Sequence, residues 1–399
     1  MTEAGTKQKK DLRYHSLDFW RGIACLSVAA FHSIDYVAEN PAHVHGNALS
    51  HQIFVLLAQG WAGVPLFFVI SGYCIAAACE SGMEKGLTTK KYFFRRFRRI
   101  YPPYWILLLL LIGAHYLFLV CRGADYFADS IQPMKTPWEM SFPQWLGSFS
   151  LTEGWRDHLV GDQGHYFLQS AWSLGYEEQF YFVCGLAMLA GRKWFYKIMA
   201  WLSVVVFAIA FIHFVVKPLP IEGFFFDGDW LMFAAGVLVF YVLQFGNERS
   251  RKWAIALLAA AALLAIALDH HKHIYAVRQM PVSFLFGIVL IVLFKRDRQI
   301  ASSTFLRPVT FCGIMCYSLY LIHMPIVKIT SQFLYRAGLN GEWSTLFVTI
   351  PVSVLVSILA AWGFFSLVER RFLNTPPSYP TKPTTPKSVP QEMPVPVNA

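Results

Sequence analysis

Two ionisable side chains within an apolar stretch are the first residues in this chain that could do chemistry. Arg21 and His32 lie in Leu17–Ser33, a segment otherwise rich in Ala, Leu, Val and Phe. Eleven residues of α-helix rise about 16 Å and return to within about 20° of the same face. An arginine near a helix end can extend its charge to the membrane surface, but ionisable groups in apolar helices usually face a bundle interior or a watery cavity. The spacing therefore predicts a polar path along one helix to a buried imidazole.

Three further ionisable residues lie inside later apolar segments. Glu177 and Glu178 are adjacent, about 12 Å from the outer end of their segment, and adjacent helical positions point about 100° apart. They cannot both serve one point, and one of them could be a protonated structural acid. His323 is expected near the depth of His32. A core histidine bonded to a neighbour is the simplest interpretation, but the shared depth favours a second imidazole at one site.

A basic and aromatic run precedes the third apolar segment. It interleaves four arginines with aromatic residues and ends in two tyrosines that flank Pro-Pro: Arg95, Arg96, Arg98, Arg99, Tyr101 and Tyr104. Such a cluster can set membrane orientation and contact anionic lipid. It can equally bind a phosphorylated cytosolic ligand, because guanidinium groups pair with phosphates and aromatic rings flank a planar base. Both interpretations stay open at this point.

The composition indicates the structural setting of these residues. Of 399 residues, 56% are hydrophobic and only 15% charged, and the apolar runs are long enough to cross a bilayer. The fold class is therefore all-α, a polytopic transmembrane bundle of about ten helices. The expected spans cover about residues 17–37, 58–79, 101–121, 167–190, 198–216, 225–245, 252–268, 280–294, 309–332 and 343–367.

The basic residues predict the orientation of the bundle. If both termini are cytoplasmic, the inner segments hold 26 of the 34 Lys and Arg residues. This is the asymmetry expected for short cytoplasmic loops. It also accounts for the net charge of +10 without a nucleic-acid partner.

Several other features have structural rather than chemical interpretations. Gly60, Gly63, Ser71 and Gly72 are expected to let helices approach closely. The loop histidines His43, His45 and His51, together with Asp269–His273, lack the companion ligands of a metal site, and no metal is expected. The seven cysteines form no Cys-x-x-Cys motif and are interpreted as small buried residues.

Three regions are expected along the chain. Residues 1–16 form a basic cytoplasmic segment, residues 17–373 the membrane domain, and residues 374–399 a tail with eight prolines that should be disordered.

The sequence resembles acyltransferase family 3, the integral-membrane O-acyltransferases known from acetylation of bacterial surface carbohydrates. The most specific element is the Arg-x10-His pattern of Arg21 and His32. Four further matches follow in order along the chain: Gly63–Gly72, Arg95–Tyr104, Trp172–Tyr181 and Tyr317–His323.

The resemblance implies transfer of an acyl group, usually acetyl from acetyl-CoA, to a hydroxyl of a carbohydrate or glycolipid on the outer side of the membrane. Acetyl-CoA or another acyl-CoA would be a co-substrate, with no permanently bound cofactor. Some members carry an additional hydrolase-like domain; this chain is expected to act as the membrane domain alone. His32 either takes the proton from the acceptor hydroxyl, which we favour, or accepts the acyl group first.

The candidate site residues fall into three groups. The catalytic group joins the two imidazoles to an acid that could orient one of them: His32, Glu177 and His323. The donor-binding group takes the cytosolic acyl-CoA: Arg21, Arg95, Arg98, Arg99, Tyr101 and Tyr104. The acceptor-binding group lies at the start of the fourth span: Trp172, Ser173 and Glu178.

One rival function belongs to another class. A transporter or flippase of a glycan or lipid-linked sugar would also use ionisable residues and proline-broken helices within the membrane. In either case we expect a multi-pass protein of the plasma membrane, the inner membrane of a bacterium, with a possible homo-oligomeric state.

Overall fold

The computed structural model describes residues 13–34, 48–122, 136–155, 166–217, 219, 223–272 and 275–373. Regular secondary structure in these residues is entirely helical, which confirms the all-α fold class. The longer helices, in chain order, are α1 (Leu17–His32), α3 (Ala48–Leu57), α4 (Gly63–Glu84), α5 (Thr89–Arg122), α6 (Phe142–Ser150), α8 (Ala171–Leu189), α9 (Arg192–Phe211), α10 (Trp230–Gln244), α11 (Glu248–Lys272), α12 (Tyr275–Leu293), α14 (Arg307–Ile314), α15 (Cys316–Arg336) and α17 (Ile350–Leu367).

Short elements connect these helices. A 3-10 turn, η2 (Ala58–Ala62), joins α3 to α4, and α13 (Asp297–Ser302) follows η5 (Phe294–Arg296). The remaining short elements are η3 (Pro137–Glu139), α16 (Glu342–Ser344), η7 (Glu369–Arg371) and two π-helical segments, η4 (Ile212–Val216) and η6 (Thr345–Thr349).

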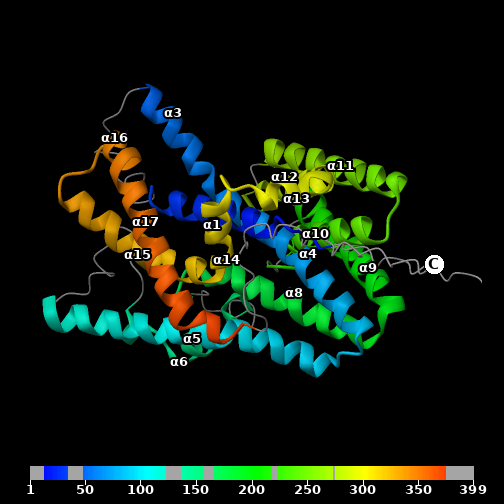
Figure 1. Cartoon of the computed structure of the whole chain (residues 1–399), viewed down its shortest axis with the longest axis horizontal. Helices are drawn as coiled ribbons and strands as arrows, with labels where there is room; N and C mark the ends of the chain where they lie inside the picture. Colours follow the sequence, from blue (N-terminus) through cyan, green and yellow to red (C-terminus); the bar gives the residue numbers. More distant parts are fainter. Residues whose placement is uncertain are drawn as a thin grey trace, which may run out of the picture.

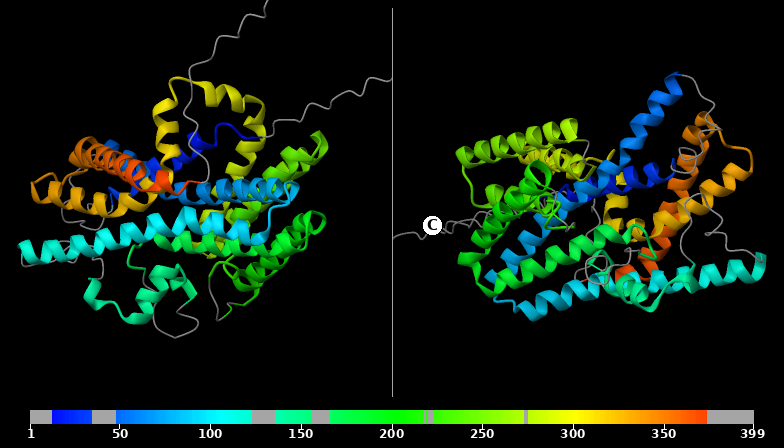
Figure 2. Two further views of the ribbon diagram at one scale, coloured as in Figure 1. Left: turned by 60° about the horizontal axis from the view of Figure 1, so that its bottom comes forward. Right: turned by 180° about the vertical axis from the view of Figure 1, so that it is seen from behind.

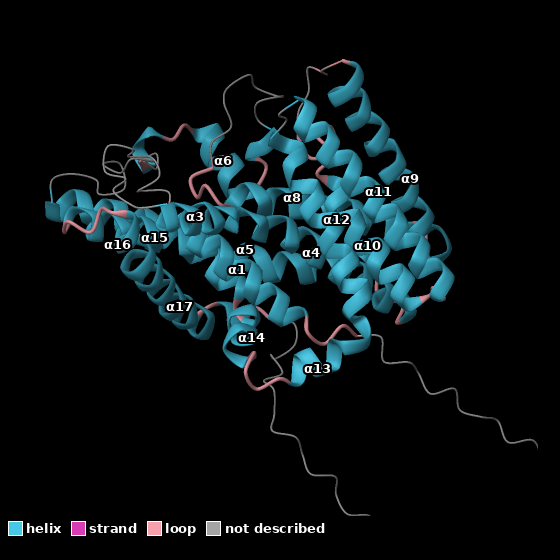
Figure 3. Ribbon diagram, turned by 90° about the horizontal axis from the view of Figure 1, so that it is seen from above, coloured by secondary structure: helices cyan, strands magenta, loops and turns pink. Residues whose placement is uncertain are grey.

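Helix α1 lies at the centre of the bundle, where it packs against α4, α14 and α15. In Figure 1, α1 and α4 separate α15–α17 on the left from α9–α12 on the right. Seen from above, α9, α10, α11 and α12 lie together at one side of the molecule (Figure 3). The central position of α1 means that any polar residue facing inward from it meets several other helices.

Glycines allow these helices to approach closely. A Cβ atom on Gly72 of α4 would lie 2.0 Å from the carbonyl oxygen of Phe233 in α10, and one on Gly63 would lie 2.3 Å from that of Ala24 in α1. Gly60 faces the carbonyl of Ser27 in the same way. The prediction of close packing is confirmed for these three glycines, whereas Ser71 instead contributes a hydroxyl group to the site described below.

One expected span is not a single straight helix, and another lies within a longer helix. Residues 309–332 do not form one straight helix, because α14 and α15 meet at an angle of 86° beside Met315. Helix α5 is longer than the third expected span, because it runs unbroken from the basic run through Pro102 and Pro103. The basic residues and the apolar span therefore share one rigid helix.

Six described helical segments are long and apolar enough to cross a membrane, or seven with the bent pair of α14 and α15. The chain is thus a multi-pass membrane protein. The count of ten spans and the cytoplasmic placement of both termini stay predictions, and the Pro-rich tail lies outside the described residues.

The start of α1 is tied to the first residue of α13. Two backbone N–H groups, of His15 and Ser16, donate to the carboxylate of Asp297 at 2.6 and 2.8 Å. A carboxylate at a helix N-terminus satisfies unpaired donors and complements the helix dipole. This contact fixes where α1 begins and therefore where Arg21 points.

Helix α6 is fastened along α5. Tyr101, Tyr104 and Trp105 donate from their side chains to the backbone carbonyls of Ser150, Ser148 and Phe149 respectively. The left panel of Figure 2 shows the length of α5 and the smaller α6 beside it. The two tyrosines expected to bind the donor thus hold α6 against α5, and their role in donor binding stays a prediction.

Candidate active site

A polar cavity of about 110 Å³ lies between α1, α4, α5, α8 and α15. Three cationic side chains, one carboxylate and several hydroxyl and thiol groups face it: Arg21, Ser71, Cys74, Arg96, Arg99, Ser173, Glu177, Tyr181, Cys316, Tyr317 and Tyr320. Five helices that are remote in sequence thus contribute to one polar enclosure within an apolar bundle. Such a convergence of charged groups in a membrane domain indicates a functional site.

Arg21 is held at the α1 side of this cavity. One guanidinium nitrogen donates to the carboxylate of Asp18 at 2.6 Å, and the other lies 3.0 Å from Sγ of Cys74 in α4. The first contact spans three residues of one helix, a spacing that brings side chains together. These contacts hold the guanidinium group at the cavity wall.

The four arginines of α5 separate into two pairs. Arg96 and Arg99 line the cavity, while Arg95 and Arg98 are exposed, and Arg98 donates to the backbone carbonyl of Arg371 at 3.1 Å. Positions three apart share a helix face, whereas neighbouring positions diverge by about 100°. Only one of the two pairs can therefore face inward.

The aromatic face of Tyr181 supports Arg96. The guanidinium carbon of Arg96 lies 5.4 Å from the ring centre of Tyr181 and 5.8 Å from that of Tyr92. A cation over an aromatic face is stabilised by the ring quadrupole. The hydroxyl of Tyr181 in turn donates to Glu177, so α5 and α8 are linked through the cavity wall.

Glu177 and Glu178 face different surroundings, as their adjacent positions predicted. Glu177 lines the cavity and accepts hydrogen bonds from Ser71 and Tyr181. Glu178 accepts from Tyr101 at 3.3 Å, and its Oε1 atom is buried without a hydrogen-bond partner among the described residues. The structure does not place Glu177 against an imidazole, the arrangement that its catalytic assignment assumed.

The imidazole rings of His32 and His323 lie next to each other. The ring centres of His32 and His323 lie 5.4 Å apart, which brings the C-terminal end of α1 against the middle of α15. His323 is 2% exposed, and its Nδ1 atom lies 2.6 Å from the carbonyl oxygen of Tyr320 and 3.2 Å from that of Leu319.

These carbonyl contacts fix the tautomer of His323. Carbonyl oxygens only accept hydrogen bonds, so Nδ1 carries a proton, and in the neutral ring the lone pair is on Nε2. Nε2 is buried and has no hydrogen-bond partner in the part of the chain that the structure describes. The backbone of α15 therefore orients the ring of His323, and Nε2 is the nitrogen that a neighbour or a substrate could contact.

The histidine pair lies just beyond the cavity on the same two helices. Val28 of α1 and Tyr320 of α15 line the cavity. His32 lies four residues after Val28 and His323 three residues after Tyr320, displacements of about 6 and 4.5 Å along a helix. Along α1, Arg21 and Val28 in the cavity wall are thus followed by His32, as the spacing of Arg21 and His32 predicted.

The three acceptor candidates diverge in position. Ser173 lines the cavity and shares a hydrogen bond of 2.9 Å with the hydroxyl of Tyr320. Trp172 packs edge-on against Phe68 and Tyr176, and Glu178 points toward α5. Only Ser173 of the three shares the cavity with Arg21.

Sequence reasoning gave no site role to three of the groups that line this cavity, Ser71, Tyr181 and Tyr320, and it treated Arg96 only as one of the four arginines of the phosphate-binding run. Arg96 had a detectable signal, because Tyr92, Ile100 and Tyr104 recur with it at helical spacing and are buried. For the two tyrosines and Ser71 the sequence offered no signal beyond their place in the matched motifs.

No group of His, Cys, Asp and Glu suited to a metal ion occurs among the described residues. His51 contacts the buried carboxylate of Glu342 at 3.2 Å, a link between α3 and α16. His43, His45 and His273 lie outside the described residues.

The comparisons with known proteins decide the family. A family model described as an acyltransferase domain matches residues 14–362, which contain every helix that lines the cavity. The chain belongs to the acyltransferase 3 family. This assignment confirms the resemblance carried by the Arg21 and His32 motif.

Curated relatives within this family carry O-acetyltransferase names. The peptidoglycan O-acetyltransferase OatA of Listeria monocytogenes is 23% identical over 353 residues, covering 82% of this chain and 52% of that protein. A putative O-acetyltransferase of Staphylococcus aureus is 25% identical over 410 residues, covering 94% of this chain and 59% of the relative. The chain thus spans a little more than half the length of these relatives. No solved structure matches it at a significant level.

Proposed function

We propose that this protein is an O-acetyltransferase that takes acetyl from cytosolic acetyl-CoA and transfers it to a hydroxyl of a carbohydrate on the outer side of the plasma membrane. The family membership and the names of the relatives support the reaction class. A surface carbohydrate is the proposed acceptor because one relative is named for peptidoglycan. Acetyl-CoA is the proposed donor because three arginines converge where a phosphorylated ligand would enter.

One observation carries the proposal: the arginine-lined cavity and the His32–His323 pair lie in series along α1 and α15. An acyl-CoA whose phosphates pair with Arg96 and Arg99 would extend its thioester arm past Arg21 toward His32. The acceptor hydroxyl would approach the imidazoles from the opposite side.

The chemical step follows from the two imidazoles. In the proposed reaction His32 accepts the proton of the acceptor hydroxyl while the oxygen attacks the thioester carbonyl carbon. The carbon–sulfur bond then breaks, the ester forms, and the CoA thiolate leaves and takes up the proton. His323 would position His32, because its Nε2 lone pair can accept a hydrogen bond from the protonated ring.

In this proposal Glu177 keeps the cavity polar rather than orienting the base. Its carboxylate accepts from Ser71 and Tyr181 and offsets the positive charge that Arg21, Arg96 and Arg99 bring into a buried space. Removal of this charge is expected to weaken the donor site rather than to alter proton transfer.

The test uses inverted membrane vesicles, whose cytosolic face is outward, and labelled acetyl-CoA. We expect label to enter the carbohydrate fraction with the native chain, and the His32→Ala variant to insert and bind donor but to transfer none. Right-side-out vesicles serve as the control, because acetyl-CoA cannot cross the bilayer. Full transfer by His32→Ala would overturn the proposal.

A transporter or flippase remains the second candidate. The 86° break between α14 and α15 beside the polar cavity is the observation that favours it, since broken helices line substrate paths in transporters. Movement of an unmodified glycan across vesicles without acetyl-CoA would support this candidate.

A further inference from the structure

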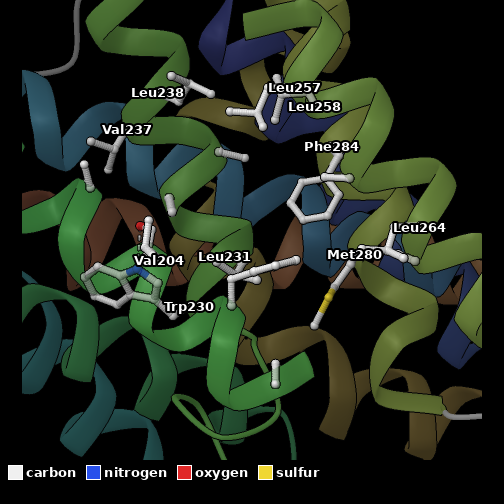
Figure 4. Close-up of a pocket in the computed structure, with 18 of the residues that line it drawn as sticks. Val204, Trp230, Leu231, Val237, Leu238, Leu257, Leu258, Leu264, Met280 and Phe284 are labelled. Carbon is white, nitrogen blue, oxygen red and sulfur yellow. Dashed lines mark hydrogen bonds between the residues drawn. The ribbon is translucent and has the colours of Figure 1, made fainter. Parts of the chain in front are cut away.

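A second cavity, larger than the polar one, lies apart from the proposed active site. It has a volume of about 710 Å³ and is formed by α9, α10, α11 and α12. Figure 4 shows its lining, in which Leu231, Leu257, Met280 and Phe284 surround an open space. None of its lining residues belongs to the polar cavity, and its volume lies in the range typical of ligand sites.

Helix α10 forms one wall of this cavity, and α9 and α11 flank it. Both flanking segments meet the criteria for membrane spans, whereas α10 has 15 residues and is shorter. The lining residues run from Trp230 to Tyr241 on α10 and from Leu257 to Leu268 on α11. Eleven residues of helix correspond to about 16 Å, close to half the thickness of a bilayer hydrocarbon core.

The lining is apolar along almost its whole length. The indole N–H of Trp230 is already bonded to the hydroxyl of Ser203 at 3.0 Å, so the cavity offers a ligand few hydrogen bonds. Alanines at positions 200, 234, 235, 261 and 265 keep the space wide. A hydrocarbon chain fits such walls, and a sugar or a nucleotide does not.

A charged side chain at one end of the cavity indicates the class of lipid that the hydrocarbon chain belongs to. Lys197 is the one charged side chain in the lining, and it lies with Tyr196, Tyr241 and Leu257 at the end where α9 and α11 begin. Its ammonium group lies 4.8 Å from the ring centre of Trp194. Lysine, tyrosine and tryptophan together are typical of the headgroup level of a membrane.

We propose that this cavity, formed by α9–α12, holds one acyl chain of an anionic phospholipid, with the phosphate of that lipid paired to Lys197. The lipid would fill the space beside α10, which packs against both α9 and α11. It would thereby fix the spacing of these helices behind α4, against which α10 packs. The proposal does not depend on the acetyltransferase assignment.

The experiment is native mass spectrometry of the full chain released from micelles with equal amounts of phosphatidylglycerol and phosphatidylcholine of identical chains. We expect one phosphatidylglycerol to be retained on the monomer at collision energies that remove the others. Equal retention of the two lipids, preferential retention of an added polyprenyl phosphate, or a lipid-free dimer would overturn the proposal.

Matched variants test the binding of the lipid headgroup and the binding of its acyl chain separately. Lys197→Gln should reduce the preference for phosphatidylglycerol about fivefold, the value of one juxtamembrane cation, whereas Lys193→Gln on the same helix outside the cavity should not. Ala234→Phe should fill the cavity and abolish retention of either lipid, and Ala260→Phe on the exposed face of α11 is its control. Native retention in Ala234→Phe would place the lipid elsewhere.

A fluorescence measurement covers the case in which Ala234→Phe fails to fold. Phosphatidylglycerol brominated in its acyl chain quenches tryptophans that it touches, and Trp230 lines the cavity while being shielded from solvent. The quenched fraction should fall in Trp230→Phe, and an unchanged fraction would contradict an occupied cavity.

Discussion

The imidazole of His323 is bonded through Nδ1 to the carbonyl oxygen of Tyr320 and lies 5.4 Å, centre to centre, from the imidazole of His32. The backbone of α15 thus determines which nitrogen of His323 is free. This geometry makes His323 a positioning residue for the base in the proposed reaction and gives it a testable signature.

Substitutions at His323 should distinguish its two nitrogens. His323→Asn offers an amide near the Nδ1 position, and His323→Gln extends an amide to the Nε2 position. If the Nε2 lone pair supports His32, Asn and Ala should each lower kcat about 100-fold or more, with Gln recovering part of the loss and KM for acetyl-CoA nearly unchanged. Steady-state kinetics and the pH profile of kcat provide the measurement. Equal activity of the Asn and Gln variants would assign His323 a packing role only.

The two arginine pairs of α5 should differ in donor binding. Arg96→Gln and Arg99→Gln each remove a cavity guanidinium group, and loss of one charge-assisted hydrogen bond of about 1.5–3 kcal/mol corresponds to about 10- to 100-fold in KM for acetyl-CoA. The matched controls, Arg95→Gln and Arg98→Gln, remove exposed charges of the same helix and should change KM less than about threefold. The reverse pattern would move the donor site to the other face of α5.

Thiol labelling should report occupancy of the cavity. Cys74 and Cys316 line it, whereas Cys121 is exposed on α5. We expect CoA to slow the reaction of N-ethylmaleimide with the two cavity thiols and to leave labelling of Cys121 unchanged. Peptide mass spectrometry after timed labelling gives the measurement. Equal labelling with and without CoA would exclude the cavity as the donor site.

Close helix contact at Gly313 should make that position intolerant of a methyl group. A Cβ atom there would lie 1.6 Å from the carbonyl oxygen of Asp18, so Gly313→Ala must separate α14 from α1 and is expected to cost about 3 kcal/mol. Gly113→Ala and Gly363→Ala are matched controls, because an added Cβ meets no atom within 4 Å at either helical position. Thermal unfolding in detergent should show a lower Tm for the first variant and equal or higher values for the controls. A native Tm for Gly313→Ala would disprove the close contact.

Much of the site followed from helical periodicity. The spacing of Arg21 and His32 was sufficient to place both on one face of α1, because a continuous helix has fixed geometry. Periodicity likewise separated Glu177 from Glu178, and the glycines of α4 indicated close packing against neighbouring helices. These features depend only on positions within one helix.

Contacts between different helices could not be predicted from periodicity within one helix. The sequence analysis treated the four arginines of α5 as one cluster, and only the packing of α5 against its neighbours separated Arg96 and Arg99 in the cavity from the exposed Arg95 and Arg98. The expected pairing of Glu177 with His32 was replaced by Ser71 and Tyr181, because α4 reaches the carboxylate. Likewise, Tyr101 donates to the carbonyl of Ser150 in α6, a contact that depends on how α5 and α6 pack together.

The sequence by itself therefore determined the family, the membrane setting and the residue types of the site, since each depends on composition or on spacing along one helix. Only the tertiary structure decided that His32 meets His323, that the cavity ends one turn before them, and that α14 turns sharply into α15. Those facts depend on how helices cross, and crossing is set by the fit of many side chains at once.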